Sequence, residues 1–126
     1  MAMLHSELTD QALGGFYAVY KELGFGFLEP VYGKAMVVEL QFRGLEVAQE
    51  VASEVVYRGV EVGRYRSDIV VEGRLLIEVK STKTITEADE RQLLNYLKTS
   101  KIEVGLLLHF GPKPAFRRLI YTNDRK

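Results

Sequence analysis

The sequence predicts an α/β domain in which a central mixed β-sheet is flanked by helices, with the element order ααβββαββ. Three observations predict it. Apolar residues recur at helical spacing up to about residue 42, and the pattern then changes to short β-branched runs separated by turn signals through residue 80. A second helix-type segment and a continuous apolar run follow. The length of 126 residues suits one compact unit, so we expect residues 1–126 to form a single domain.

The first two elements are predicted to be helices. Thr9 or Asp10 is placed to cap the first one, and Gly24 stands where a C-terminal glycine stop is expected. The second helix begins at Glu29-Pro30, where an acidic residue precedes a proline that a first helical turn accepts. Its broad apolar face contains Val31, Ala35, Val38 and Phe42, with Tyr32, Met36 and Leu40 beside them.

Three strands are predicted next, joined as two hairpins. The first covers residues 45–57, and Arg58-Gly59 supplies the turn into residues 60–71. The segment 72–74, Glu-Gly-Arg, is the second turn, and the third strand covers residues 75–80.

The rest of the chain predicts one helix and two strands. Thr84 or Thr86 opens the helix, and residues 104–110 are a continuous apolar run of the buried-strand type. Residues 111–114, Gly-Pro-Lys-Pro, break that run, and residues 116–121 form a short final strand.

Composition excludes several classes of site. The chain has no cysteine, so disulfides, thiolate zinc sites and thiol nucleophiles are excluded and an intracellular setting is expected. His5 and His109 are too few for a polyhistidine metal site. No apolar run approaches the roughly 18 residues that span a bilayer, and the start lacks the regions of a signal peptide. We therefore expect a cytoplasmic protein without membrane contact.

Charge is balanced overall but not along the chain. Lys plus Arg and Asp plus Glu both number 17, which taken alone argues against a polyanionic partner. Residues 1–63 carry a balance of −5, however, and residues 64–126 one of +5. The basic side chains of the second half form either a surface for nucleic acid or a solvated scatter, depending on the fold. They include Arg64, Arg66, Lys83, Arg91, Lys98, Lys101, Lys113, Arg117 and Arg118.

The third predicted strand places charge where a core residue is expected. Odd positions in residues 75–80 are all apolar, so Glu78 and Lys80 lie together on the other face. If residues 72–74 are the hairpin loop, Asp68 on the preceding strand lies opposite Glu78, with about 5 Å between their β-carbons.

Two carboxylates at that distance repel each other, and a divalent cation between them relieves the repulsion. Mg²⁺ prefers such oxygen ligands, polarises phosphoryl oxygens and activates water. Lys80 would then orient that water or stabilise charge on a phosphate. The alternative is that Asp68, Glu78 and Lys80 form an ion-pair cluster on a solvated sheet face.

The spacing of Asp68 and Glu78-Val79-Lys80, on a hairpin between helices, resembles the PD-(D/E)xK nuclease superfamily. Within it, Gly26-Phe27-Leu28-Glu29-Pro30-Val31-Tyr32 is similar to the signature of the small GxxExxY family. The resemblance runs from about residue 8 to residue 121. It implies a restriction-endonuclease-like core, Asp68 and Glu78 as metal ligands, and Lys80 as the catalytic lysine. It also implies that Glu29 is a further acidic residue at the metal.

The same resemblance implies that Gln92 and Tyr96 form the Gln-x-x-x-Tyr element that some of these nucleases place beside the active site. Four residues apart, they share a helix face. The chain departs from the pattern at Ser67, where proline precedes the aspartate in the superfamily, and at Tyr20, where a histidine is expected. Tyr32 has two interpretations, helix packing or a role at the site.

Together these features predict a metal-dependent nuclease that uses Mg²⁺ or Mn²⁺ and hydrolyses phosphodiester bonds of nucleic acid, with DNA as the expected substrate. A domain this small has little surface for gripping a duplex, which favours a homodimer. The alternative is a non-catalytic module with the nuclease fold that binds or assembles with a partner.

Overall fold

The computed structural model describes residues 4–126, and its element order confirms the predicted ααβββαββ arrangement. A short 3₁₀ turn, Asn123–Arg125, follows the last strand. The elements are α1 (Ser6–Leu23), α2 (Glu29–Phe42), β1 (Val47–Tyr57), β2 (Val60–Val71), β3 (Leu75–Lys80), α3 (Glu87–Thr99), β4 (Val104–Phe110) and β5 (Pro114–Ile120).

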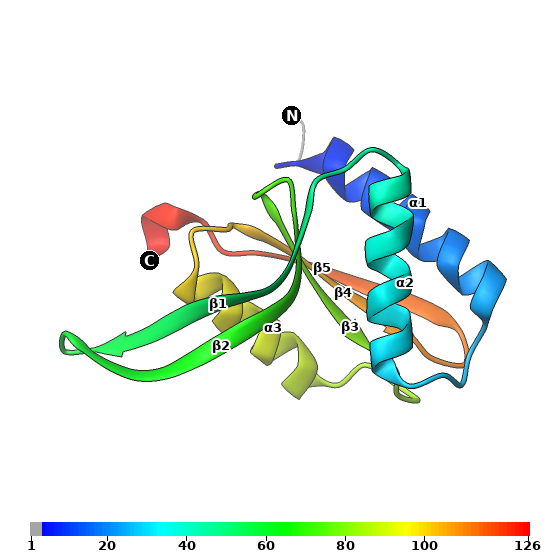
Figure 1. Cartoon of the computed structure of the whole chain (residues 1–126). Helices are drawn as coiled ribbons and strands as arrows, with labels where there is room; N and C mark the ends of the chain where they lie inside the picture. The colour runs from blue at the N-terminus through cyan, green and yellow to red at the C-terminus, as the bar shows by residue number, and fades with distance from the viewer. Residues whose placement is uncertain (1–3) are drawn as a thin grey trace.

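The five strands form one mixed sheet in sequence order, β1-β2-β3-β4-β5 (Figure 1). Strands β3 and β4 are parallel because α3 connects them, and the other neighbours are antiparallel. The far part of the β1–β2 hairpin extends beyond the other strands as a two-stranded ribbon (Figure 1).

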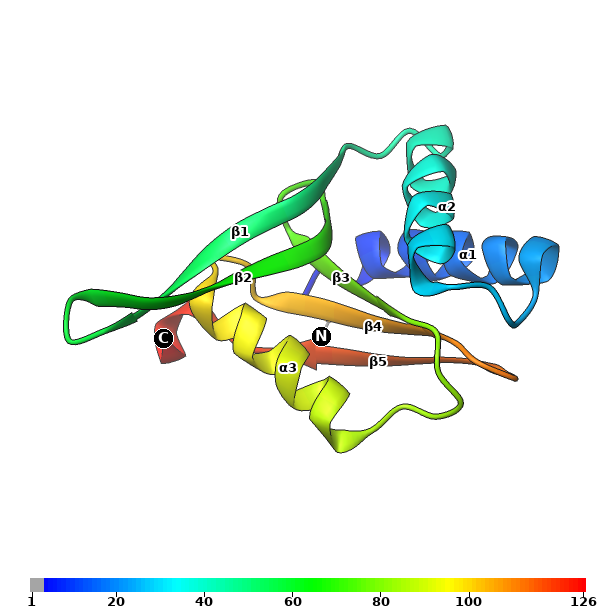
Figure 2. The ribbon, with the colours of Figure 1, turned by 60° about the horizontal axis from the view of Figure 1, so that its bottom comes forward.

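Helices cover both faces of the sheet, α1 and α2 on one and α3 on the other (Figure 2). Leu75, Ile77 and Val79 of β3 belong to the larger core, which is shared with α1 and α2. Leu76 belongs to the smaller core beneath α3. The alternation predicted for β3 is therefore confirmed, and Glu78 shares the α3 face with Leu76. Within residues 4–126, no helix is long and apolar enough to cross a bilayer.

Both predicted hairpin turns are present. Arg58 and Gly59 have positive φ angles of 52° and 80°, as a two-residue primed turn requires. Glu72 and Gly73 also have positive φ angles, of 53° and 64°. In the first hairpin the strand register shifts between Val55 and Val56 at a bulge.

The predicted beginning of the first helix is wrong. The helix starts at Ser6, with His5 as the residue before it, and Thr9 lies inside it with 3% of its surface exposed. Thr9 and Asp10 are therefore not caps. The last strand also starts earlier than predicted, because Pro114 already pairs with Phe110.

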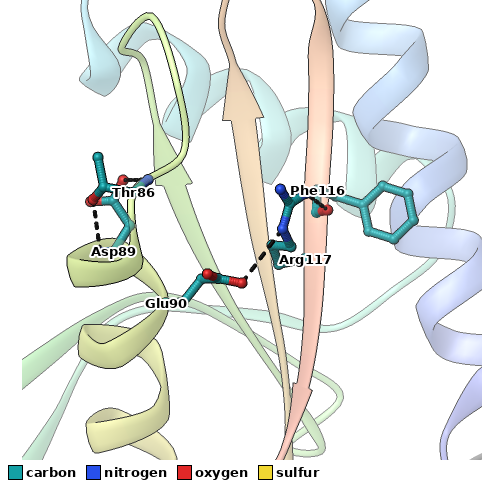
Figure 3. A network of polar contacts seen from close by, with 5 residues as sticks. All are labelled: Thr86, Asp89, Glu90, Phe116 and Arg117. Carbon is teal, nitrogen blue, oxygen red and sulfur yellow. Dashed lines mark hydrogen bonds and ion pairs between the residues drawn. The ribbon is translucent and has the colours of Figure 1, made fainter.

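The predicted opening of α3 is confirmed at Thr86. The Thr86 hydroxyl accepts a hydrogen bond from the Asp89 N–H (3.1 Å), and the Asp89 carboxylate accepts one from the Thr86 N–H (3.0 Å) (Figure 3). This capping box satisfies two backbone donors and fixes where the helix leaves the loop after β3.

The broad apolar face predicted for the second helix is divided in the structure. Tyr32, Met36 and Leu40 are fully buried against the larger core. Val38 and Phe42, in contrast, expose 67% and 86% of their surface. Nothing in the sequence alone distinguishes the two sets, since both recur at helical spacing.

We predict that Gly111→Ala destabilises the end of β4. A Cβ at this position would lie 2.9 Å from the Thr82 carbonyl oxygen and still closer to the His109 ring. The free energy of unfolding, measured by urea denaturation, should fall by about 1–3 kcal/mol. Gly33→Ala in α2 is the control, because nothing lies within 4 Å of its added methyl group. Equal stabilities of Gly111→Ala and the unaltered protein would contradict the packing described for this turn.

Candidate active site

The site begins where strands β2 and β3 separate. Their register is the one predicted, with Ile69 opposite Ile77, but the ladder ends at that pair. Asp68 and Glu78 are therefore not a hydrogen-bonded strand pair. Instead, Oδ2 of Asp68 accepts a hydrogen bond from the backbone N–H of Val79 at 3.0 Å. The carboxylate takes the place of a ladder carbonyl and is thereby fixed beside the edge of β3.

Glu78 is the buried acid of the site. It exposes only 5% of its surface, and its Oε1 atom has no hydrogen-bond partner. Burial raises the pKa of Glu78 from 4.5 to about 9, and repulsion by the Asp68 carboxylate adds to the shift. A buried acid with an unpartnered oxygen is costly, which contradicts the alternative of a solvated ion-pair cluster at this residue.

The two acids fit a divalent cation. An unpartnered buried oxygen beside a second carboxylate is the oxygen donor set that Mg²⁺ and Mn²⁺ accept, and Mg²⁺ is often held by one or two carboxylates with water in its remaining positions. Among the residues that the structure describes, no three Asp, Glu or His side chains gather into a larger ligand group. Asp68 and Glu78 are thus the two side chains that could hold such a cation.

Lys80 lies two residues further along β3 and is held by α3. Its Nζ atom donates a hydrogen bond to Oε1 of Gln92 at 3.1 Å, and Nε2 of Gln92 donates to the Tyr96 hydroxyl at 3.3 Å. Tyr65 of β2 packs edge-on against Tyr96, with ring centroids 4.5 Å apart. Burial raises the pKa of Tyr96, and the Glu78 and Asp68 carboxylates add to the effect. The structure therefore brings Lys80, Gln92 and Tyr96 together beside the acids.

The loop before α2 explains the residues of the Gly-x-x-Glu-x-x-Tyr motif. Gly26 has a φ angle of 118°, which side chains disfavour. The Tyr32 hydroxyl donates to the Gly24 carbonyl (2.5 Å) and accepts from the Phe27 N–H (3.2 Å), and its ring stacks on Phe110. Tyr32 is fully buried, so its place is in packing and in holding this loop. The loop in turn sets where Glu29 begins the helix.

Glu29, at the start of α2, lies near Asp68. Glu29 and Asp68 both line a cavity of about 230 Å³ between α2 and strands β1 to β3. Partial burial raises the pKa of Glu29, attraction to Lys80 opposes that shift, and repulsion by Asp68 and Asp89 adds to it. The charges of Asp68 and Lys80 therefore act on the Glu29 carboxyl. Within residues 4–126, however, Glu29 forms no three-carboxylate group with Asp68 and Glu78.

A further acid, Glu50, lies beside Asp68 although no sequence pattern predicts it there. The pairs Gln49–Ile69 and Val51–Ser67 place Glu50 across from Asp68, and both residues line the same cavity. A two-residue turn without a bulge would put Gln49 there instead. The bulge near the hairpin end shifts the register by one residue, and no turn signal in the sequence marks it.

Part of the basic half converges near the site. Lys83, Lys113 and Arg117 line a cavity of about 400 Å³, together with His109. His109 is the β4 neighbour of Lys80 in the sheet, so this cavity lies one strand beyond Lys80. Arg117 also forms an ion pair with Glu90 of α3, at 3.5 Å (Figure 3).

Other basic residues do not join them. Arg64 pairs with Glu54 and Glu61 on the β1–β2 hairpin, and Arg66 lies 3.8 Å from Glu50. The second half of the chain thus contributes a local basic cavity and a mixed-charge hairpin.

Comparisons with known proteins agree with this fold. The family model of the PD-(D/E)XK nuclease superfamily matches residues 6–119. Comparison with curated proteins finds no significant match. Among solved structures, the crystal structure of SSO0001 is similar in fold, with a TM-score of 0.56 and 22% sequence identity. The match covers 96% of this chain and 62% of that one. With a family model that spans nearly all of its elements, the chain belongs to the PD-(D/E)XK nuclease superfamily.

Proposed function

We propose that the protein is a metal-dependent nuclease that hydrolyses phosphodiester bonds of DNA, and that it is a member of the GxxExxY group within the superfamily. The observation that carries the proposal is the buried carboxyl of Glu78, which has an Oε1 atom without a hydrogen-bond partner, lies beside Asp68 and stands two residues before Lys80. A carboxylate in a structural ion pair would have its buried oxygen atoms paired with the cation or with hydrogen-bond donors. Cysteine-free composition supports action in the cytoplasm.

Each residue has a role that follows from its contacts. Asp68 and Glu78 would hold Mg²⁺ or Mn²⁺, which when bound polarises a phosphoryl oxygen and lowers the pKa of an attacking water. Lys80, restrained by Gln92, presents its ammonium to the reacting phosphate and stabilises the negative charge that develops there. Tyr96 fixes Gln92 from the other side. Glu29 lines the same cavity as Asp68, between α2 and the sheet.

A direct assay tests this function. The protein is incubated with single-stranded DNA, duplex DNA and RNA, each with Mg²⁺, with Mn²⁺ or with a chelator. We expect cation-dependent cleavage of DNA that the chelator abolishes. If no substrate is cleaved faster than by the Lys80→Ala variant, the catalytic function is wrong and a non-catalytic nuclease-fold module is the better description.

The basic cavity supports a polyanionic substrate and gives a separate prediction. Lys83→Ala/Lys113→Ala removes two cations that line it. Binding of DNA, measured by fluorescence anisotropy in chelator, should weaken, and the slope of log affinity against log salt should become shallower by about 1–2 units.

The matched control is Lys98→Ala/Lys101→Ala, which removes the same charge from the other end of α3. Equal effects of the two double variants would show that net charge, and not the cavity, governs binding.

A further inference from the structure

The outer face of α2 carries an apolar stripe at coiled-coil spacing. Val31, Ala35, Val38 and Phe42 follow one another at intervals of four, three and four residues, as the a and d positions of a heptad do, and Leu28, the residue just before the helix, stands three residues ahead of them. Leu28 exposes 78%, Val31 40%, Val38 67% and Phe42 86% of its surface, and Ala35 in the centre is half-buried.

Apart from Ala35, which packs partly against the larger core, the stripe has no partner among the residues that the structure describes. The opposite side of α2 already packs on the larger core through Tyr32, Met36 and Leu40. A helix that is apolar on both sides is ordinarily buried on both sides. Phe25 and Phe27, in the loop before α2, are 51% and 48% exposed and extend the apolar surface beyond the helix. Exposed apolar side chains gathered on one helix and the loop before it are typical of an interaction site.

We propose that a second copy of this chain covers the stripe, with the two α2 helices packed side by side and parallel. The charges at its borders favour this occupant. In the heptad that the stripe defines, Lys34 is at a g position and Glu39 at the e position five residues later. In a parallel pair these are the positions that meet across the interface, so each Lys34 faces the Glu39 of the other copy.

An antiparallel pair is less favourable by the same reasoning. It would bring g positions next to g positions and thus place Lys34 near its own counterpart. Glu39 already accepts a hydrogen bond from Arg43 at 2.7 Å, and its second carboxylate oxygen is free to accept one from Lys34. The half-buried Ala35 at the centre lets the helices approach closely.

The parallel arrangement adds the loops before α2 to the area that the helices bury. A 14-residue helix is about 21 Å long, and one helix face alone falls short of the roughly 800 Å² per partner of a standard interface. Because parallel helices have their N-terminal ends together, the Phe25 and Phe27 loops of both copies meet there and add to the area. Both Glu29 residues, and hence both candidate sites, then lie at the same end of the dimer.

Sedimentation velocity tests the surface with a matched pair of variants. Val38→Glu places a charge on the stripe, and Val62→Glu places one on the β1–β2 hairpin at a valine that is 60% exposed. We expect the unaltered protein and Val62→Glu to sediment as dimers at micromolar concentration, and Val38→Glu to raise the dimer dissociation constant about tenfold or more. A monomeric unaltered protein, or dissociation by Val62→Glu to the same extent, would overturn the proposal.

A cysteine variant tests the parallel orientation, since the chain has no other thiol. In a parallel pair the two Val38 positions face each other, and a disulfide needs Cα atoms within about 7 Å. Copper phenanthroline, as the oxidant, should therefore cross-link Val38→Cys nearly completely and leave Val62→Cys uncross-linked. Dimers that fail to cross-link at position 38 would overturn the parallel pair, and equal cross-linking of both variants would overturn the choice of the α2 surface.

Discussion

Lys80→Ala is expected to lower the rate of DNA cleavage by about 10² to 10⁴-fold at saturating cation. The reason is the position of Lys80, which lies two residues after the buried Glu78. Its Nζ atom is held there by a 3.1 Å hydrogen bond to Oε1 of Gln92. Removing the ammonium takes away the cationic group that would stabilise charge on the phosphate. Because Lys80 is only half-buried, the fold should persist.

Asp68→Asn is the companion variant. Asparagine preserves the size of the side chain, and its oxygen still accepts a hydrogen bond from the Val79 N–H. The contact that holds β2 and β3 where they separate is therefore retained. The negative charge is lost, and we expect cleavage to fall by at least about 10²-fold. Single-turnover cleavage, with circular dichroism to verify folding, measures both variants, and Lys98→Ala, at the other end of α3, is the control for loss of a lysine charge. A folded Asp68→Asn or Lys80→Ala that cleaves as fast as the unaltered protein would contradict the roles assigned here.

The second large effect concerns stability in the absence of cation. Burial and Asp68 raise the pKa of Glu78 in the folded state to about 9, against 4.5 as its ordinary value. Between these pH values the folded protein binds a proton that the unfolded chain releases. The free energy of unfolding should therefore fall as the pH rises through this range, by up to about 1.4 kcal/mol for each pH unit.

Glu78→Gln removes this dependence because the amide does not ionise. The variant should be as stable as the unaltered protein near pH 4.5 and more stable at pH 8, on the order of a few kcal/mol. Urea denaturation in chelator at several pH values measures the difference. Glu22→Gln, at an exposed position of α1, is the control and should leave the pH dependence unchanged. An unaltered protein at least as stable as Glu78→Gln at pH 8 would show that Glu78 ionises without penalty.

The sheet and the position of the acids could be predicted from local patterns. Alternation in residues 75–80 separates Ile77 from Glu78 by face, and the turn signal in residues 72–74 predicts the strand register that the structure has. What the pattern could not show is that the ladder stops at Ile69–Ile77. The ladder ends there because the Val79 N–H donates to the Asp68 side chain and not to a backbone carbonyl of β2. This hydrogen bond is a tertiary contact.

The second helix shows what hydrophobic periodicity cannot predict. Tyr32 and Val38 are both apolar and both recur at helical spacing, yet one is buried and the other is exposed. Hydrophobic periodicity identifies apolar faces but not their partners, because a core and an interface between copies bury the same kinds of side chain. Glu50 was missed for a related reason, since one bulge in the hairpin decides which β1 residue lies across from Asp68.

The central claim is that Asp68 and Glu78 hold a divalent cation. Calorimetric titration with Mn²⁺ at pH 7.5, repeated in two buffers of different ionisation enthalpy, tests it most directly. The unaltered protein should bind Mn²⁺ and release about one proton per chain, because the Glu78 carboxyl must ionise to act as a ligand. Asp68→Asn should bind at least about tenfold more weakly, and Glu78→Gln should release no proton. No binding to the unaltered protein, or equal binding by Asp68→Asn, would contradict the claim.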